Sequence, residues 1–161
     1  MRKAIFAGSF DPMTIGHINI IKRASELFDE LYVVGAYNID KKGILSPDER
    51  VELITAALAD YKNVKVVTHT GLTAAFAKEN GIKYLVRGIR NAQDAQYEIE
   101  LAINNKFIND ELETIILPAD KEHLITSSTQ VKQFASFDVD ISTLVPEEIR
   151  VKFLEKLNRN K

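Results

Sequence analysis

A ten-residue segment near the amino terminus carries residue types that bind phosphate. Residues 8–17 read GSFDPMTIGH and lie between a short apolar run, typical of a strand, and a stretch of helical period. A turn from strand to helix leaves free backbone N–H groups and the positive end of a helix dipole in one place. Because His17 closes the segment, we expect a phosphate site that includes an imidazole.

Three further polar groups follow predicted strands. They are Lys41 with Lys42, Arg87 with Arg90, and the hydroxyl run at residues 126–129. The carboxyl ends of parallel strands meet at one edge of a sheet, so we expect all three groups beside the first segment. Ammonium and guanidinium groups, hydroxyls and helix-terminal N–H groups together are what a polyphosphate needs from a protein.

Each of these features, taken alone, also has a purely structural explanation. His17 fits a capping or surface histidine, and Lys41 with Lys42 fits a solvated loop. The hydroxyls at 126–129 fit a helix N-cap, and Glu98 fits the acidic first turn of a helix as well as a ligand role. The joint pattern favours phosphate chemistry, because the sequence offers no rival set of paired carboxylates, metal ligands or a serine with a base.

Short apolar strands that alternate with helices must position these groups. Such alternation predicts right-handed βαβ crossovers. It therefore indicates an α/β fold, a Rossmann-like, doubly wound parallel sheet of five strands with helices on both faces. The expected strands occupy residues 4–7, 31–36, 64–67, 84–86 and 114–117.

Helix signals fall between and after these strands. The strongest is SPDE at residues 46–49, a capping box with proline in the first turn. Asn80 and Gly81 are expected to end a later helix, and residues 118–126 are expected to form a loop. The expected helices span residues 18–28, 46 onward, 72–79, 94–107, 127–134 and 146–157, the last two being C-terminal helices.

The bulk composition fits a single domain over residues 1–161. A hydrophobic content of 45% supports a packed core. A net charge of -2 and a pI of about 5.9 argue against nucleic acid or an anionic membrane as a partner. The chain has no cysteine, no apolar run of bilayer length and no signal-peptide pattern, so we expect a soluble, cytoplasmic protein.

These motifs together resemble one known family. TIGH at residues 14–17 is similar to the (T/H)xGH signature of the nucleotidyltransferase superfamily, and RGIR at residues 87–90 narrows the resemblance. In order and spacing, nearly the whole chain resembles the bacterial phosphopantetheine adenylyltransferases. The resemblance implies transfer of the adenylyl group of ATP to 4'-phosphopantetheine in coenzyme A biosynthesis. It also implies Mg²⁺ bound with ATP and a homohexamer built as a dimer of trimers.

The resemblance implies a role for each matching residue. The expected catalytic residues are His17, Lys41 and Arg90. The acceptor is expected to be bound by Ser9, Lys41, Thr73 and Arg87. ATP is expected to contact Ser9, Phe10, His17, Gly88, Ile89, Arg90, Glu98, His123, Leu124, Ile125, Thr126, Ser127, Ser128 and Thr129. No protein ligand to a metal is expected.

The chemistry expected of such a site requires no general base. The acceptor phosphate has a second pKa of about 6 and is mostly dianionic at neutral pH, so the nucleophile arrives activated. Transfer at phosphorus then needs in-line placement and neutralisation of charge. At a helix N-terminus the field disfavours an imidazolium, so we expect His17 to act as a neutral hydrogen-bond donor.

Three alternatives stay open on the sequence alone. The first is another small nucleotidyltransferase of the superfamily, with nicotinate mononucleotide or a phosphorylated alcohol as acceptor. The second is a nucleotide-binding regulatory module without chemistry, although such a module need not keep His17, Lys41, Arg87 and Arg90. A flavodoxin-like receiver or electron carrier ranks last, because the acidic cluster that a receiver needs near its first strand is missing.

Overall fold

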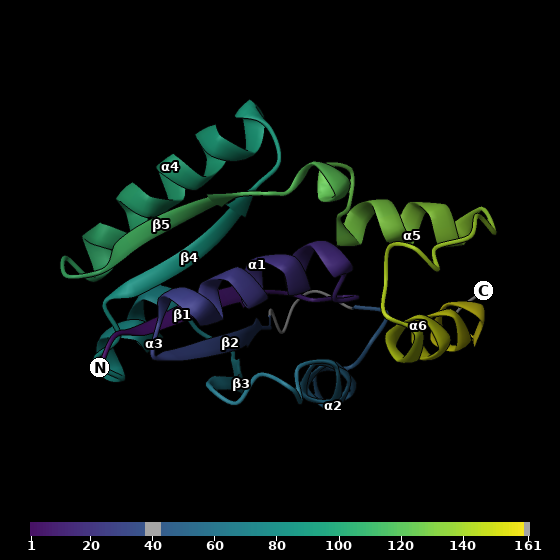
Figure 1. Cartoon of the computed structure of the whole chain (residues 1–161), viewed down its shortest axis with the longest axis horizontal. Helices are drawn as coiled ribbons and strands as arrows, with labels where there is room; N and C mark the ends of the chain where they lie inside the picture. Colours follow the sequence, from purple (N-terminus) through teal and green to yellow (C-terminus); the bar gives the residue numbers. More distant parts are fainter. Residues whose placement is uncertain (38–42, 160–161) are drawn as a thin grey trace.

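The computed structural model describes residues 1–37 and 43–159. Their five strands form one parallel sheet (Figure 1). The strand order is β3-β2-β1-β4-β5, which confirms the predicted doubly wound class. Each strand contains its predicted range and extends beyond it. The strands are β1 (Lys3–Gly8), β2 (Glu30–Ala36), β3 (Val64–His69), β4 (Tyr84–Ile89) and β5 (Glu113–Pro118).

Helices cover both faces of the sheet, as predicted (Figure 1). Four of them, α1, α2, α5 and α6, contribute to one apolar cluster, and α3 contributes to a second cluster on the other face. Right-handed crossovers produce this division, because the chain crosses the sheet in both directions. The helices of the described residues are α1 (Ile15–Leu27), α2 (Pro47–Ala57), α3 (Thr73–Glu79), α4 (Ala92–Ile108), the 3₁₀ helix η1 (Lys121–His123), α5 (Ser128–Ser136) and α6 (Glu147–Arg159).

Local signals in the sequence form as predicted. Ser46 Oγ accepts the N–H of Glu49 at 3.2 Å, and Glu49 Oε2 accepts the N–H of Ser46 at 2.9 Å, which completes the capping box. Gly81 has a φ of 63° just past the end of α3, where a glycine adopts the left-handed conformation without strain. The predicted loop at 118–126 is corrected in one respect, because it contains η1.

The central strand β1 is buried on both faces. Ala4 and Phe6 belong to one apolar cluster, whereas Ile5 and Ala7 belong to the other. This alternation is what a strand in the middle of a sheet with two covered faces requires. Among the helices of residues 1–37 and 43–159, none is long and apolar enough to cross a membrane.

The direction in which the chain builds the sheet reverses beside β1. The chain runs from β1 outward to β2 and β3, and then returns to place β4 on the other side of β1. The connections that leave β1 and β4 therefore diverge, which opens a crevice at the carboxyl ends of these two strands. Residues 8–17 leave β1 at this crevice, and residues 87–89 end β4 there, with Arg90 directly after them.

A buried carboxylate holds the loop after β1 in place. Asp11, which is 2% exposed, accepts the N–H of Leu45 at 2.9 Å and that of Ile44 at 3.0 Å. It also forms ion pairs with Lys132 at 2.9 Å and with Arg50 at 3.7 Å. Burial raises the pKa of Asp11, but hydrogen bonds from Leu45 and Lys132 outweigh burial and lower this pKa below its ordinary value. The carboxylate is therefore ionised at neutral pH.

Arg50 extends this network to the first segment. Its Nε donates to the carbonyl of Leu45 at 3.0 Å, and its Nη1 donates to the carbonyl of Ser9 at 3.0 Å. Gly43 leaves room for the guanidinium, because a Cβ at this position would lie 1.7 Å from Arg50 Nη2. A charged network inside the protein thus joins the first segment to the chain that leads into α2.

Replacing Asp11 with alanine tests this network. The change removes the ionic partner of buried Arg50 and leaves two N–H groups unsatisfied. We therefore expect Asp11→Ala to lower the free energy of unfolding by about 2–4 kcal/mol, as measured by urea unfolding at neutral pH. Asp60→Ala, at an exposed carboxylate, is the control and should change it by less than about 0.5 kcal/mol. Equal effects of the two substitutions would contradict a structural role for Asp11.

Candidate active site

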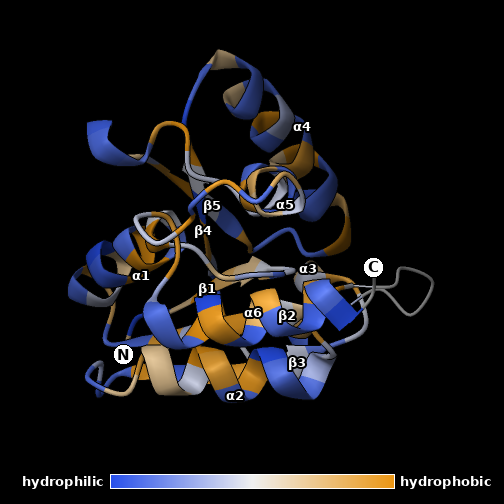
Figure 2. Cartoon of the chain, turned by 90° about the vertical axis from the view of Figure 1, so that its right-hand side faces the viewer, coloured by the Kyte–Doolittle hydropathy of each residue, from blue (hydrophilic) through white to orange (hydrophobic). Residues whose placement is uncertain are grey.

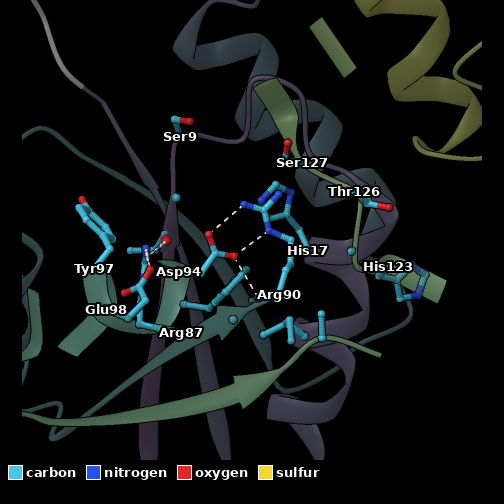
Figure 3. Close-up of a pocket in the computed structure, with 17 residues that line it drawn as sticks. Ser9, His17, Arg87, Arg90, Asp94, Tyr97, Glu98, His123, Thr126 and Ser127 are labelled. Carbon is cyan, nitrogen blue, oxygen red and sulfur yellow. Dashed lines mark hydrogen bonds and ion pairs between the residues drawn. The ribbon is translucent and has the colours of Figure 1, made fainter. Parts of the chain in front are cut away.

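A cavity of about 360 Å³ lies in the crevice at the carboxyl ends of β1 and β4. Side chains reach it from the first segment, the end of β4, the start of α4 and the chain between β5 and α5. Figure 3 shows Arg90 with Asp94 near the centre, Arg87 with Glu98 on one side, and His123 on the other. The predicted convergence of the site segments is found for those that the structure describes.

The ring of His17 takes part in capping α1. Thr14 is the N-cap residue, and its Oγ1 accepts the N–H of His17 at 3.3 Å. In return, the N–H of Thr14 donates to Nδ1 of His17 at 3.0 Å. Because Nδ1 accepts this hydrogen bond, a neutral ring carries its proton on Nε2. The start of the helix therefore makes the imidazole an N–H donor at the cavity, which His17 lines.

The surroundings keep His17 uncharged at neutral pH. Burial, and then the positive charges of Arg87 and Arg90, lower the pKa of His17 from 6.5 to about 4. The expected neutral imidazole is found, but its causes are burial and the two arginines; the helix field that the sequence indicated is not among them. Phe10 packs edge-on against the imidazole, with ring centroids 5.2 Å apart and an interplanar angle of 88°. Phe10 has a φ of 48°, a conformation uncommon for any residue other than glycine.

Arg87 reaches the site from within β4, not from a loop after it. The predicted strand ended at Val86, whereas β4 continues to Ile89. Arg87 donates from Nε and Nη2 to the two carboxylate oxygens of Glu98, each at 2.7 Å. Its Nη1 donates to the carbonyl of Ala7 at 2.6 Å. This bidentate pair fixes the plane of the guanidinium, and Glu98 is only 5% exposed.

Arg90 is held in a similar way by a residue four positions later. Its Nε and Nη2 donate to the carboxylate of Asp94 at 2.8 and 3.1 Å, and its backbone N–H donates to the same group at 3.0 Å. These hydrogen bonds lower the pKa of Asp94 below its ordinary value. Asn91 caps α4 by accepting the N–H of Asp94 at 2.9 Å. Two acidic residues in the first two turns of α4 thus orient both arginines of the site.

The end of the cavity beside α1 is narrow and contains buried polar atoms. A Cβ on Gly88 would lie 3.1 Å from Ile20 Cγ1, so glycine allows β4 to approach α1 closely. Thr126 Oγ1 and His123 Nδ1 are buried with no hydrogen-bond partner among the residues described. Both residues line the cavity. Unpartnered polar atoms in such a place suit a polar ligand.

The start of α5 also borders the cavity. Ser127 lines it, and Ser127 Oγ accepts the N–H of Gln130 at 3.1 Å, as expected of an N-cap residue. The hydroxyl of Ser128 donates to the carbonyl of Pro12 at 2.7 Å. Within residues 1–37 and 43–159, the N–H groups of Ser128 and Thr129 have no acceptor. Such groups at a helix start are suited to bind an anion.

The cavity brings together predicted site residues that are far apart in the chain. Those that line it are Ser9, His17, Arg87, Gly88, Arg90, Glu98, His123, Thr126 and Ser127. The other predicted residues in the described ranges do not line it, and they are Phe10, Thr73, Ile89, Leu124, Ile125, Ser128 and Thr129. Lys41 lies outside the described residues.

Several contacts of the site were missed by sequence reasoning. Asp94 and Tyr97 line the cavity, and Asp94 holds Arg90. The spacing of four residues between Arg90 and Asp94 was a usable signal, because such pairs meet on a helix or at its start. Arg50 and Lys132, by contrast, gave no local signal, since the carboxylate that they share is distant in sequence.

The part of the chain that the structure describes has no dedicated metal site at the cavity. That part contains no group of three or more histidine, cysteine, aspartate or glutamate residues that could hold a metal ion. The cavity carboxylates of Asp94 and Glu98 are both engaged with arginines. These residues do not fit a resident metal ion.

Known proteins are similar to this chain in sequence or in fold. The family described as cytidylyltransferase-like matches residues 5–134. The chain is 42% identical to a phosphopantetheine adenylyltransferase from Thermotoga neapolitana, over 98% of each chain. It is 41% identical to a protein of the same name from Finegoldia magna, over 97% of this chain and 96% of that one.

A solved structure is similar in fold alone. Plasmodium falciparum nicotinic acid mononucleotide adenylyltransferase, complexed with NaAD, matches with a TM-score of 0.70 and 16% identity, over 96% of this chain and 95% of that one. This likeness extends to the sheet and its helices. The full-length identity with the bacterial relatives is far higher. The chain belongs to the phosphopantetheine adenylyltransferase family, within the cytidylyltransferase-like proteins.

Proposed function

We propose that this protein is a pantetheine-phosphate adenylyltransferase. It transfers the adenylyl group of ATP to 4'-phosphopantetheine, giving dephospho-coenzyme A and pyrophosphate, a step in coenzyme A biosynthesis. The observation that carries this conclusion is the identity of 40–42%, over nearly the full chain, with curated relatives named phosphopantetheine adenylyltransferase. The cavity supports it, because a neutral N–H donor and two oriented guanidinium groups suit transfer at phosphorus.

The reaction exchanges one phosphorus–oxygen bond for another. An oxygen of the acceptor phosphate attacks the α-phosphorus of ATP, and the bond from that phosphorus to the oxygen bridging to the β-phosphorus breaks. The electron pair of the broken bond leaves with pyrophosphate. With a second pKa of about 6, the acceptor phosphate is mostly a dianion at neutral pH and carries no proton that must be removed.

His17 acts where charge develops. Its Nε2–H donates to a non-bridging oxygen of the α-phosphate as the new bond forms. The hydrogen bond from Thr14 fixes the ring, and a pKa of about 4 keeps it neutral, so the imidazole gains no proton at neutral pH. Arg90 stabilises ATP from the end of β4, and Arg87, held by Glu98, binds the acceptor.

The remaining assignments rest on the resemblance. ATP enters with Mg²⁺ bound to its phosphates, and Lys41 binds the acceptor phosphate. Thr126, Ser127 and the helix start that follows bind the nucleotide, which supplies partners for the polar atoms buried there. The enzyme acts in the cytoplasm on small-molecule substrates, with no nucleic acid or membrane as partner.

The chain assembles with copies of itself, in the homohexamer that the resemblance implies. A groove of about 450 Å³ between α4 and the edge strand β5 supports contact with a second copy. Ile103 on α4 lines this groove and is 64% exposed, and Phe107 on the same helix is 95% exposed. Figure 2 shows apolar stretches along α4. Large apolar side chains exposed on one helix, beside the buried Glu98, indicate that a second copy of the chain covers this face.

A pyrophosphate-release assay with ATP, Mg²⁺ and 4'-phosphopantetheine tests the proposed reaction. We expect release to depend on the acceptor, and mass spectrometry should detect dephospho-coenzyme A. Nicotinate mononucleotide and a phosphorylated alcohol, each offered with ATP and with CTP, are the comparison substrates. Turnover of one of these instead would identify another nucleotidyltransferase. Tight ATP binding without turnover of any acceptor would identify a regulatory module.

Substitution of His17 tests its role in the transition state. We expect His17→Ala to lower kcat by about two to three powers of ten, with a smaller change in KM, because one transition-state donor is lost. Lys22→Ala, at an exposed position of the same helix, is the control and should leave kcat nearly unchanged. An unchanged kcat in a folded His17→Ala protein would rule out the catalytic role.

The pH profile distinguishes His17 from the acceptor phosphate as the titrating group. With a pKa of about 4, His17 stays neutral over the range in which the acceptor phosphate titrates. We expect activity to fall below about pH 6, as the acceptor dianion is protonated. Because the substrate causes this limb, residual activity of His17→Ala should show it at the same pH. Disappearance of the limb from the variant would show that His17 itself titrates there.

A further inference from the structure

Two contacts, one helical turn apart, join α5 to the loop after β1. Ser128 Oγ donates to the carbonyl of Pro12 at 2.7 Å, and Lys132 Nζ lies 2.9 Å from Asp11 Oδ2. Residues four apart share a face of a helix, so one face of α5 rests on two adjacent loop residues. Figure 1 shows α5 starting beside the first turn of α1, which this loop precedes.

The lysine contact differs from a surface ion pair, because its partner is buried. The side chain of Asp11 is 3% exposed and that of Lys132 is 40% exposed. Without Lys132, Asp11 would still accept two backbone N–H groups and pair with Arg50. Lys132 is therefore the member of the network that can be replaced without leaving a buried charge unpaired.

The start of α5 is the part of this helix that borders the cavity. Ser127 lines the cavity, and the adjacent N–H groups of Ser128 and Thr129 have no acceptor within the described ranges. Lys132 does not line the cavity, and its ammonium faces Asp11. Lys132 can therefore affect a ligand at the start of α5 only indirectly, by fixing the position of the helix.

We propose that Lys132 is a positioning residue for ATP: its ion pair with Asp11 sets where the first N–H groups of α5 meet the nucleotide. This inference rests on the proposed function, because it takes ATP as the ligand of the cavity. Ser128 shares the role, since its hydroxyl is engaged with Pro12 and only its backbone N–H remains for ATP.

Substitution of Lys132 tests the inference, with ATP–Mg²⁺ binding measured by calorimetry. We expect Lys132→Met to weaken ATP binding about tenfold, and Lys132→Arg to restore most of the affinity, because arginine keeps the ion pair. The KM for 4'-phosphopantetheine should change less than that for ATP, since Asp11 keeps its contacts to Ile44 and Leu45. Thermal unfolding should shift by no more than about 4 °C.

A double-mutant cycle with Ser128→Ala separates positioning from direct contact. Either single change loosens the same helix, so we expect the two effects on ATP affinity to be less than additive. Lys22→Met, which removes an exposed positive charge from α1, is the control for net charge and should bind ATP as the wild type does.

The outcomes separate this inference from the proposed function. Unchanged ATP affinity in Lys132→Met would overturn the positioning role while wild-type turnover upheld the proposed reaction. Fully additive losses in the cycle would also overturn it, because they would show that Lys132 and Ser128 act independently and not through one shared placement of α5. Failure of the wild type to bind ATP would overturn the proposed function itself.

Discussion

The reversal of strand order at β1 is the constraint on which the site depends. Because β4 lies beside β1 but is reached from the opposite edge of the sheet, the connections after these two strands separate and leave a crevice. His17 enters the crevice from one connection and Arg90 from the other. Had β4 been added next to β3, two strands would separate β1 from β4 and this crevice would not open between them.

Within this crevice, residues whose hydrogen bonds cap the starts of α1 and α4 also orient the side chains of the site. The N–H of Thr14 both closes the first turn of α1 and selects the tautomer of His17. Asp94 donates its backbone N–H to the capping side chain of Asn91 at the start of α4, and its carboxylate orients Arg90. Residues that begin a helix thus prepare a reacting group, so the site is largely organised before a substrate arrives.

The sequence predicted features that depend on neighbours in the chain and missed those that depend on distant ones. The capping box at Ser46 was recognised because it depends on a pattern within a few residues, and the class of the sheet was recognised because strand and helix patterns alternate along the chain. The end of β4 was misplaced, because pairing of Arg87 and Gly88 with β5 extends the strand. The ion pair between Asp11 and Lys132 was not predicted, since no local pattern connects two residues so far apart.

The positive charge of each cavity arginine is balanced by a carboxylate of the protein itself, and this affects how a charged ligand is held. Each guanidinium has its own carboxylate, so the two ion pairs Arg87–Glu98 and Arg90–Asp94 contribute no net charge, and the neutral imidazole adds none. A pocket with a large positive excess would retain a released polyanion by long-range attraction. Among the described residues of the cavity, a polyanion would therefore be held by directed hydrogen bonds more than by excess charge, and such bonds act only while the phosphate oxygens are aligned with their donors.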